Sequence, residues 1–204
     1  MKKRILCYGD SNTYGFDPRG MFGSRLPSDK RWTGILARSC PWEILSMGLN
    51  GRTIPHCDSE YKLMDSVVSR SLPLDGIIIM LGTNDMQTMF RPTPEKITIR
   101  MEKFLIKLQK HEVFQSETPP WILLLAPPLL DMSWWEEKMA AKMASLSAQV
   151  NQCYGQLAEH MGLYFADTAR WHIPLLYDGI HFSEEGHQLF AQKLQIVLED
   201  ILKD

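Results

Sequence analysis

Five short apolar runs alternate along the chain with longer segments in which apolar residues recur at helical spacing. The runs span residues 4–9, 42–47, 75–81, 121–126 and 163–166. Their hydrophobicity is continuous rather than alternating, which is typical of strands that are covered by helices on both faces. The runs therefore predict the strands of a parallel sheet.

The intervening segments predict helices. They span residues 32–39, 94–110, 135–160 and 184–203. In the second of them apolar residues recur every three or four positions, which gives the helix one apolar face. Strand–helix alternation of this kind predicts an α/β fold. We expect one domain over residues 1–204, a three-layer α/β/α sandwich with a flavodoxin-like parallel five-stranded sheet in the order 2-1-3-4-5.

Composition narrows the class of partner. The 204 residues are 45% hydrophobic and 23% charged, which is enough for one well-buried core. The formal net charge of -2 provides no basic surface for nucleic acid. No apolar stretch approaches the roughly 20 residues of a membrane helix. We therefore expect neither a nucleic-acid partner nor a membrane partner.

The cysteines and the first residues predict a cytoplasmic protein. Cys7, Cys40, Cys57 and Cys153 form no Cys-x-x-Cys pair, and a chain of this size does not need disulfides. The apolar run that follows the basic residues 2–4 is only four residues long before a Gly-Asp pair, too short for a secretory signal. A reducing compartment is the expectation.

Two long connections follow predicted strands at the carboxyl edge of the sheet, where ligands bind in doubly wound folds. They span residues 12–31 and 126–135. Both are expected to shape a pocket. Four aromatic residues in them could line a narrow entrance, or could equally pack in the core or against a second subunit: Tyr14, Phe16, Trp134 and Trp135.

Ser11 follows the first predicted strand by two residues, which places it at this edge. A serine hydroxyl is a nucleophile only when a neighbouring base takes its proton. The backbone N–H of Ser11, at the start of a turn or helix, could also bind an oxyanion. Taken alone, the residue fits a helix cap as well.

Asp178 and His181 stand three residues apart in Asp-Gly-Ile-His, just before the last predicted helix. In a tight turn the Asp178 carboxylate could fix the tautomer of His181, and the imidazole could then accept the proton of Ser11. The alternative is a capping aspartate and a solvated histidine. The order Ser, Asp, His is that of the α/β-hydrolases, but their Gly-x-Ser-x-Gly elbow is absent.

Two further strands are followed by candidate oxyanion donors. Asn84 follows the strand at 75–81, which neighbours the first strand in the predicted order. Its side-chain amide could donate to an oxyanion, although an Asx turn explains it too. The segment 46–53 follows the second strand, and a glycine in it would allow backbone to approach a ligand and could supply another N–H donor, or form a plain turn. The remaining histidines show no metal-ligand spacing, so we expect no metal.

Four sequence blocks together resemble the SGNH hydrolases, also called the GDSL-like esterase/lipase superfamily. The blocks are Gly9-Asp10-Ser11, Asn50-Gly51-Arg52-Thr53, Gly82-Thr83-Asn84-Asp85 and Asp178-Gly179-Ile180-His181. The resemblance implies a triad of Ser11, His181 and Asp178 and no metal or organic cofactor. It also implies three oxyanion donors, which are the N–H groups of Ser11 and Gly51 and the side chain of Asn84.

The first block departs from the family name, because Asn12 stands where leucine is expected. This residue is expected to alter the pocket floor. We expect three residues to contact substrate: Asn12, Asn50 and Trp134.

Further segments resemble bacterial arylesterases that also transfer acyl groups to alcohols and catalyse perhydrolysis. They are residues 4–11, 31–34, 77–85 and 178–182. This resemblance implies a serine esterase that hydrolyses short-chain aryl, alkyl or acetyl esters through an acyl-enzyme, with acyl transfer to alcohols as an additional reaction. The partner would be a small-molecule ester. That branch also forms oligomers with a restricted apolar channel, so a homo-oligomer is left open here.

Three alternatives remain open from sequence. Deacetylation of O-acetylated sugars would use the same site. A flavodoxin-like protein could cradle the phosphate of FMN in residues 11–15, although that leaves Asn84 and the 178–181 turn without a role. A catalytically silent relative could self-associate through an exposed apolar patch of Met86, Met89, Phe90, Trp134 and Trp135.

Overall fold

A five-stranded parallel sheet forms the centre of the protein in the computed structural model, which describes residues 2–20 and 22–203. Its strands are β1 (Arg4–Gly9), β4 (Glu43–Gly48), β5 (Gly76–Met80), β6 (Trp121–Leu125) and β7 (Tyr164–Ala166). The order β4-β1-β5-β6-β7, with every neighbouring pair parallel, confirms the predicted 2-1-3-4-5 arrangement.

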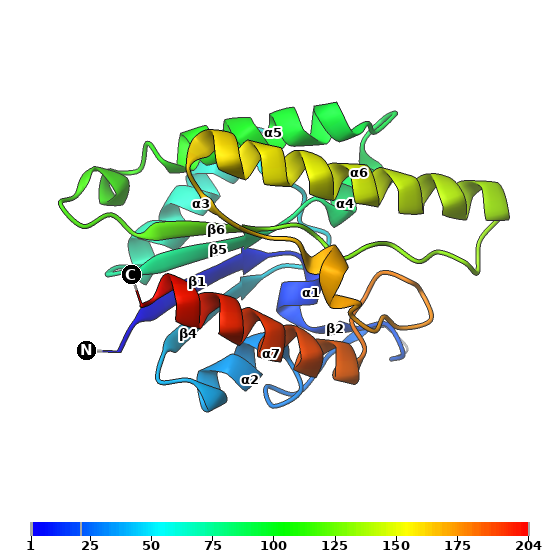
Figure 1. Ribbon diagram of the computed structural model, residues 1–204, viewed down its shortest axis with the longest axis horizontal. Coiled ribbons are helices and arrows are strands. Elements are labelled where there is room, and N and C mark those ends of the chain that lie inside the picture. Colours follow the sequence, from blue (N-terminus) through cyan, green and yellow to red (C-terminus); the bar gives the residue numbers. More distant parts are fainter. Residues whose placement is uncertain (1, 21, 204) are drawn as a thin grey trace.

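Helices cover both faces of the sheet, as Figure 1 shows. On one face lie α2 (Trp32–Ser39) and α7 (Glu184–Ile201), which pack against each other. On the other lie α3 (Asp58–Ser71), α5 (Pro94–Leu108) and α6 (Glu137–Met161). The predicted three-layer α/β/α sandwich is therefore confirmed, and the four predicted helices begin within two residues of their predicted starts.

The two layers of helix enclose two separate cores, because successive strand side chains point to opposite faces. In β1, Leu6 and Tyr8 join the core under α3, α5 and α6, whereas Ile5 and Cys7 join the core under α2 and α7. The central strand β5 is buried along its whole length. This two-sided burial explains why the strand sequences show continuous hydrophobicity.

Several elements were not predicted. Helix α3 buries only Met64, Val68 and Ser71 among its 14 residues, so its apolar pattern is weak. The others are short: α1 (Ser11–Tyr14), β2 (Phe16–Asp17), β3 (Ser24–Arg25), α4 (Thr83–Thr88), and the 3₁₀ turns η1 (Glu112–Gln115) and η2 (Thr168–Trp171). Strands β2 and β3 form a small antiparallel hairpin within the long connection after α1.

The carboxyl ends of three neighbouring strands define the edge where the candidate residues lie. Gly9 at the end of β1 is paired with Gly48 of β4 on one side and Met80 of β5 on the other. Ser11, the 49–53 segment and α4 follow these three strand ends directly. Segments that are far apart in the sequence therefore begin side by side.

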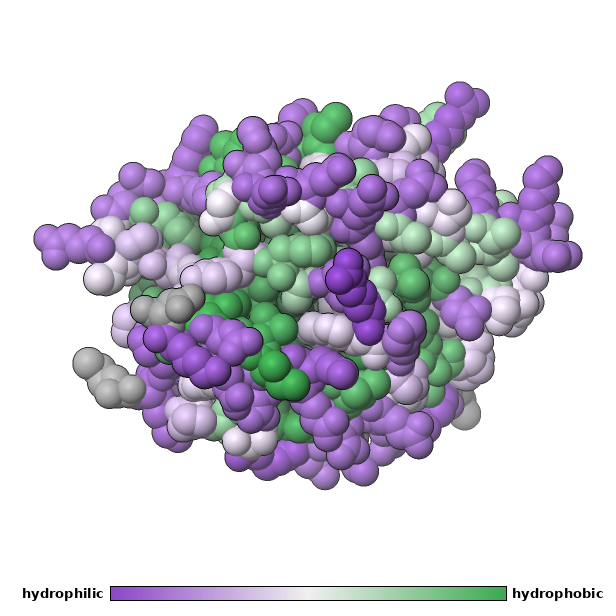
Figure 2. Space-filling view, viewed as in Figure 1, coloured by the Kyte–Doolittle hydropathy of each residue, from purple (hydrophilic) through white to green (hydrophobic). Residues whose placement is uncertain are grey.

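The surface is largely hydrophilic on the face shown in Figure 2, with hydrophobic side chains gathered between the two helix layers. Phe90 and Trp134, from the proposed self-association patch, are exposed. Met86 is only 1% exposed and belongs to the core, so its place in that patch was predicted wrongly. No helix within the described residues is long and apolar enough to span a bilayer.

Candidate active site

Ser11, His181 and Asp178 form a continuous hydrogen-bonded chain. Ser11 Oγ lies 2.9 Å from His181 Nε2, and His181 Nδ1 lies 2.6 Å from Asp178 Oδ2. An ionised carboxylate can only accept, so Nδ1 carries the ring proton and Nε2 accepts from the Ser11 hydroxyl. Such a chain can supply a nucleophile, a base and an orienting group in the order that acyl transfer requires.

The turn that carries Asp178 and His181 is organised by the same carboxylate. Asp178 Oδ1 accepts hydrogen bonds from the backbone N–H groups of Ile180 and His181, each at 3.0 Å. Burial raises the pKa of Asp178, but the bonds from the His181 ring and from the two N–H groups outweigh it and leave the pKa below its usual value. The carboxylate is therefore ionised at neutral pH.

Gly179 is required at this turn for two reasons. Its φ of +67° lies in the left-handed region, and a Cβ there would sit 1.4 Å from the carbonyl oxygen of Asp131. The loop after β6 thus packs directly on the turn, and the N–H of Asp131 donates to Gly179 O at 2.9 Å.

Ser11 begins the one-turn helix α1, whose N-cap is Asp10. The Asp10 carboxylate is buried and accepts from the N–H of Asn12 at 3.0 Å. Burial raises the pKa of Asp10 to about 6, against the lowering effect of the Asn12 N–H and of His181. The N–H of Ser11 has no acceptor among the described residues, so it is free to meet a ligand.

The segments that carry Gly51 and Asn84 follow β4 and β5, and they are in contact with each other. Asn84 Nδ2 donates to the carbonyl oxygen of Arg52 at 3.0 Å, which joins α4 to the segment that contains Gly51. Gly51 has a φ of +70°, and its N–H has no acceptor within the described part of the chain. The predicted oxyanion donors therefore lie in segments that are in contact with each other.

Gly48 allows two backbone segments to approach each other closely. A Cβ at this position would lie 2.1 Å from the backbone nitrogen of Tyr14. The close approach at Gly48 is thus made by the backbone of α1, not by a ligand. Its missing side chain allows α1, and with it Ser11, to lie against the end of β4.

Arg52 is a structural residue of the site that was not identified from sequence. Its Nη1 donates to Gly9 O at 2.8 Å and also to Met47 O, and its guanidinium lies 4.1 Å from the centre of the Tyr8 ring. It therefore holds the ends of β1 and β4 together, directly before Ser11 and the Gly51 segment. The sequence feature that could have identified Arg52 is its position next to Gly51 in the block Asn50-Gly51-Arg52-Thr53.

Asp85 is a second residue of this kind. It is fully buried, and its carboxylate accepts from the N–H of Ile54 and from Arg100 Nη1, both at 2.9 Å. A buried charge requires such partners. Asn84 and Asp85 thus hold successive points of the segment that carries Gly51.

The three residues predicted to contact substrate differ in position. Asn12 is 1% exposed, and its side chain faces the 178–182 turn through two hydrogen bonds. The side-chain direction in a one-turn helix was not evident from sequence, and a contact of Asn12 with substrate stays a prediction. Asn50 is exposed on the segment before Gly51. Trp134 is 59% exposed, and its Nε1 donates to Asp178 O at 2.9 Å.

Of the other loop aromatics, Phe16 is half-buried and lies with its ring centre 4.9 Å from that of His181. Trp135 stacks on Trp134 at 5.8 Å. Trp134 and Phe16 therefore reach the turn that carries His181 from the loops after β6 and α1. Both loops shape the site, as their positions after strand ends indicated.

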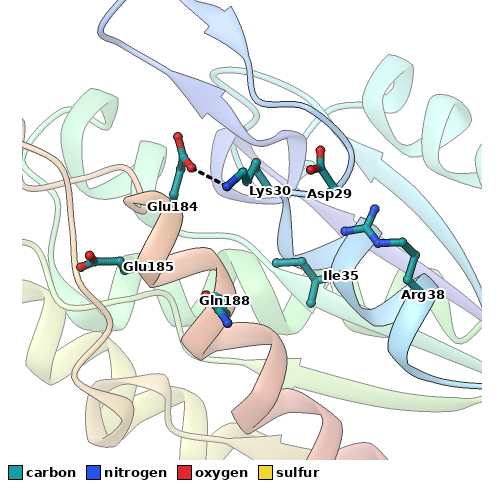
Figure 3. Close-up of a pocket in the computed structure, with 7 residues that line it drawn as sticks. All are labelled: Asp29, Lys30, Ile35, Arg38, Glu184, Glu185 and Gln188. Atoms are coloured by element: carbon teal, nitrogen blue, oxygen red, sulfur yellow. Dashed lines mark ion pairs between the residues drawn. The ribbon is translucent and has the colours of Figure 1, made fainter.

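The loop after α1 is also tied to the start of α7 by charge. Glu184 pairs with Lys30 at 3.2 Å and with Arg19 at 3.4 Å. Figure 3 shows the surface pocket beside this pair, which is lined by Ile35 and by charged side chains from α2, α7 and the loop before α2. The pocket contains none of the predicted site residues.

Comparison with known proteins agrees with this geometry. Residues 7–189 match the model of the GDSL-like Lipase/Acylhydrolase family. The chain belongs to this family. Members of the family are hydrolases that act on esters, so the same description applies to this chain. A comparison with curated proteins found no match.

Solved structures of esterases are also similar to this chain over nearly its whole length. Est24, a carbohydrate acetylesterase from Sinorhizobium meliloti, is 30% identical with a TM-score of 0.82, over 98% of this chain and all of that one. The native aryl esterase of M. smegmatis is 31% identical with a TM-score of 0.78, over 95% and 98% of the two chains. A second carbohydrate acetylesterase family member from Sinorhizobium meliloti is 28% identical with a TM-score of 0.84, over 99% and 100%.

Proposed function

We propose that this protein is a serine esterase that hydrolyses short-chain carboxylic esters through an acyl-enzyme on Ser11. One observation carries the proposal: Ser11 Oγ is 2.9 Å from a ring nitrogen of His181, whose other nitrogen is 2.6 Å from Asp178. Membership of a family of ester hydrolases supports the same reaction.

In the first half-reaction, Ser11 Oγ attacks the ester carbonyl carbon while His181 Nε2 takes the hydroxyl proton. The negative charge that develops on the carbonyl oxygen is stabilised by the N–H groups of Ser11 and Gly51 and by the Asn84 amide. Asp178 stabilises the imidazolium that forms. His181 then gives its proton to the departing alcohol or phenol, and the acyl group remains on Ser11.

In the second half-reaction, water takes the place of the alcohol. His181 removes a proton from the water as its oxygen attacks the acyl carbon, and the same donors stabilise the second oxyanion. Collapse returns the proton to Ser11 Oγ and releases the carboxylic acid. An alcohol that replaces water at this step gives a new ester, which is the acyl transfer we propose as an additional reaction.

A preference for short acyl groups is supported by the surroundings of the nucleophile. Ser11 is 6% exposed, and Phe16 packs against the ring of His181. Trp134 stands beside Asp178 on the other side of the turn. Because these aromatic side chains lie beside the base and its carboxylate, we propose that they limit the room for the acyl group, so long acyl chains should be disfavoured.

Deacetylation of sugars is the second candidate. It is supported by the likeness to Est24, a carbohydrate acetylesterase, which covers nearly the whole of both chains. The chemistry at Ser11 would be the same, and only the leaving group would differ. A panel of acetylated sugars and aryl acetates, assayed with the same enzyme preparation, separates the two by kcat/KM.

The flavin-binding alternative has little support. A hydroxyl-rich loop that cradles a phosphate in residues 11–15 would direct its side chains, as well as backbone N–H groups, towards the phosphate. Instead, Ser11 is bonded to His181, and Asn12 is bonded to the backbone on both sides of that histidine. Both residues are thus directed towards the 178–182 turn.

The test is hydrolysis of p-nitrophenyl esters of increasing acyl length by the wild type and Ser11→Ala. We expect activity on acetate and butyrate that decreases with longer chains and falls at least about 10³-fold in the variant. Ser69→Ala is the matched control, because Ser69 also bonds a histidine but lies on α3. Wild-type turnover in Ser11→Ala would contradict the proposal.

We also propose that the protein forms a homo-oligomer. The exposed aromatic residues Phe90 and Trp134 support it, since large apolar side chains at a surface often mark contacts between subunits. Light scattering after size-exclusion chromatography gives the mass directly. A monomer at assay concentration would contradict this part.

A further inference from the structure

Asn12 is bonded to the chain on both sides of His181. Its Nδ2 donates to the carbonyl oxygen of Ile180 at 3.0 Å, and its Oδ1 accepts from the N–H of Phe182 at 2.9 Å. The two contacts link residues that are 168 and 170 positions apart. One side chain thus fixes the backbone immediately before and after the imidazole.

The Asn12 backbone is fixed as well. Its N–H donates to Asp10 Oδ1 at 3.0 Å, and its carbonyl oxygen accepts from Trp32 Nε1 at 3.0 Å. The residue is 1% exposed, and Phe182 is fully buried. Asn12 is therefore a rigid support, and the N–H of Phe182 that it satisfies is shielded from water.

Only a short side-chain amide can make both of the hydrogen bonds formed at position 12. Ile180 offers an acceptor and Phe182 offers a donor, so the side chain must supply one of each. Leucine has a similar size but supplies neither. Aspartate supplies the acceptor, but its second oxygen would face the Ile180 carbonyl and repel it.

We propose that Asn12 is a positioning residue that sets the distance between Ser11 Oγ and His181 Nε2. Asn12 is covalently next to Ser11, so its two bonds connect the nucleophile and the base through a few rigid atoms. Without them, the direct hydrogen bond between the serine and the histidine is the one between Oγ and Nε2. The inference rests on the proposed esterase function.

The rest of the turn does not depend on Asn12. Asp178 Oδ1 holds the N–H groups of Ile180 and His181, and the N–H of Asp131 holds Gly179 O. The contact between Asp178 and the imidazole therefore survives the loss of Asn12. What is lost is the alignment of this pair with Ser11.

The experiment compares Asn12→Leu and Asn12→Asp with the control Asn151→Leu. Asn151 is also a buried asparagine whose Nδ2 donates to a loop carbonyl, that of Pro127 at 3.0 Å, but it lies on α6. We expect kcat to fall about 10²-fold in Asn12→Leu and about tenfold in Asn12→Asp, with KM changed less than about threefold. Asn151→Leu should lose thermal stability but keep kcat.

The pH profile adds a measurement that a purely structural role would not affect in this way. In the Asn12 variants the plateau of kcat/KM should fall, while the pH of half-maximal activity stays at its wild-type value. Reaction with phenylmethanesulfonyl fluoride, followed on folded protein, should slow by the same factor as kcat.

Three results would overturn the inference. They are a wild-type kcat in Asn12→Leu, a rise in KM at constant kcat as expected for a substrate contact, and an equal loss of kcat in Asn151→Leu. Ser11→Ala is measured in parallel. If Ser11→Ala is inactive and Asn12→Leu is fully active, the inference fails alone; if Ser11→Ala is fully active, the proposed function fails.

Discussion

Two serine–histidine pairs in this molecule have nearly equal spacing but opposite proton positions. Ser11 Oγ is 2.9 Å from His181 Nε2, and Ser69 Oγ is 3.0 Å from His111 Nε2. The difference lies at the other ring nitrogen. His181 Nδ1 faces the carboxylate of Asp178, whereas His111 Nδ1 accepts from the backbone N–H of Val113 at 3.2 Å.

The group that contacts Nδ1 of each histidine decides which ring nitrogen carries the proton. In the neutral ring of His181, Nδ1 must carry the proton, so Nε2 is left as a base for Ser11. In the neutral ring of His111, Nδ1 accepts and Nε2 must donate to Ser69, which cannot lose a proton to it. A serine near a histidine is therefore not by itself a nucleophile.

The largest expected loss of kcat comes from a substitution that makes the Ser11–His181 pair resemble the Ser69–His111 pair. In Asp178→Asn the side-chain amide can donate to His181 Nδ1, as the Val113 N–H does for His111. The wrong tautomer would then face Ser11, and kcat should fall about 10⁴-fold while the fold persists. Kinetics on p-nitrophenyl acetate, with circular dichroism as a check of folding, measure this; a loss below tenfold would contradict the tautomer argument.

A smaller effect is expected when the pair is left intact and only the oxyanion donor is removed. Asn84→Ala should lower kcat about 10²–10³-fold, with little change in the pH profile. The variant also loses the bond to Arg52 O. Asn84→Asp retains the shape of the side chain but replaces the donor with an acceptor, so it should be at least as inactive as alanine. Because neither variant can donate to Arg52 O, activity of Asn84→Asp above that of Asn84→Ala would contradict the role of Asn84 as an oxyanion donor.

A third histidine extends the comparison to stability. His187 Nδ1 lies 3.4 Å from the donating N–H of Trp32, and burial, with Arg31 and His181 nearby, lowers its pKa to about 4. The unfolded chain takes up a proton near pH 6.5, but the folded chain does so only near pH 4. The stability due to neutral His187 is thus complete above pH 6.5 and is lost as the pH falls, by about 2–3 kcal/mol at pH 4.5.

Urea denaturation of the wild type and His187→Asn at pH 7.5 and pH 4.5 measures this effect. The asparagine keeps an acceptor for the Trp32 N–H and does not titrate. We expect the free energy of unfolding to fall less in the variant than in the wild type between the two pH values. Equal pH dependence in both proteins would contradict the assignment.

The smallest effect is expected at the second pair itself. Ser69→Ala removes a half-exposed hydrogen bond to a histidine that caps η1, so it should cost about 1 kcal/mol or less of unfolding free energy. Esterase activity should stay within about twofold of the wild type. A tenfold loss would mean that the second pair contributes to the reaction.

Elements with strong apolar patterns were predictable, and those held by polar contacts were not. Strands such as β5, buried on both faces, were located within a residue. Helix α3 was not predicted, because only three of its 14 residues are buried. The β2–β3 hairpin has strands of two residues, too short for any periodicity.

The same distinction applies to the candidate site. The motif residues Ser11, Asp178 and His181 lie in hydrogen-bonding contact, because their places at strand and helix ends follow from the fold. The role of Asn12 could not be predicted, since its partners are backbone atoms of a turn 168 residues away. Arg52 is a similar case, because the carbonyl groups it holds become neighbours only in the folded sheet.

The most direct test of the account identifies the nucleophile by covalent labelling. The protein is treated with phenylmethanesulfonyl fluoride, digested and analysed by mass spectrometry, with Ser11→Ala and Ser69→Ala in parallel. We predict one adduct per chain, on the peptide that contains Ser11, which is absent from Ser11→Ala and undiminished in Ser69→Ala. Labelling of Ser69, or esterase activity that persists without any adduct on Ser11, would contradict the assignment.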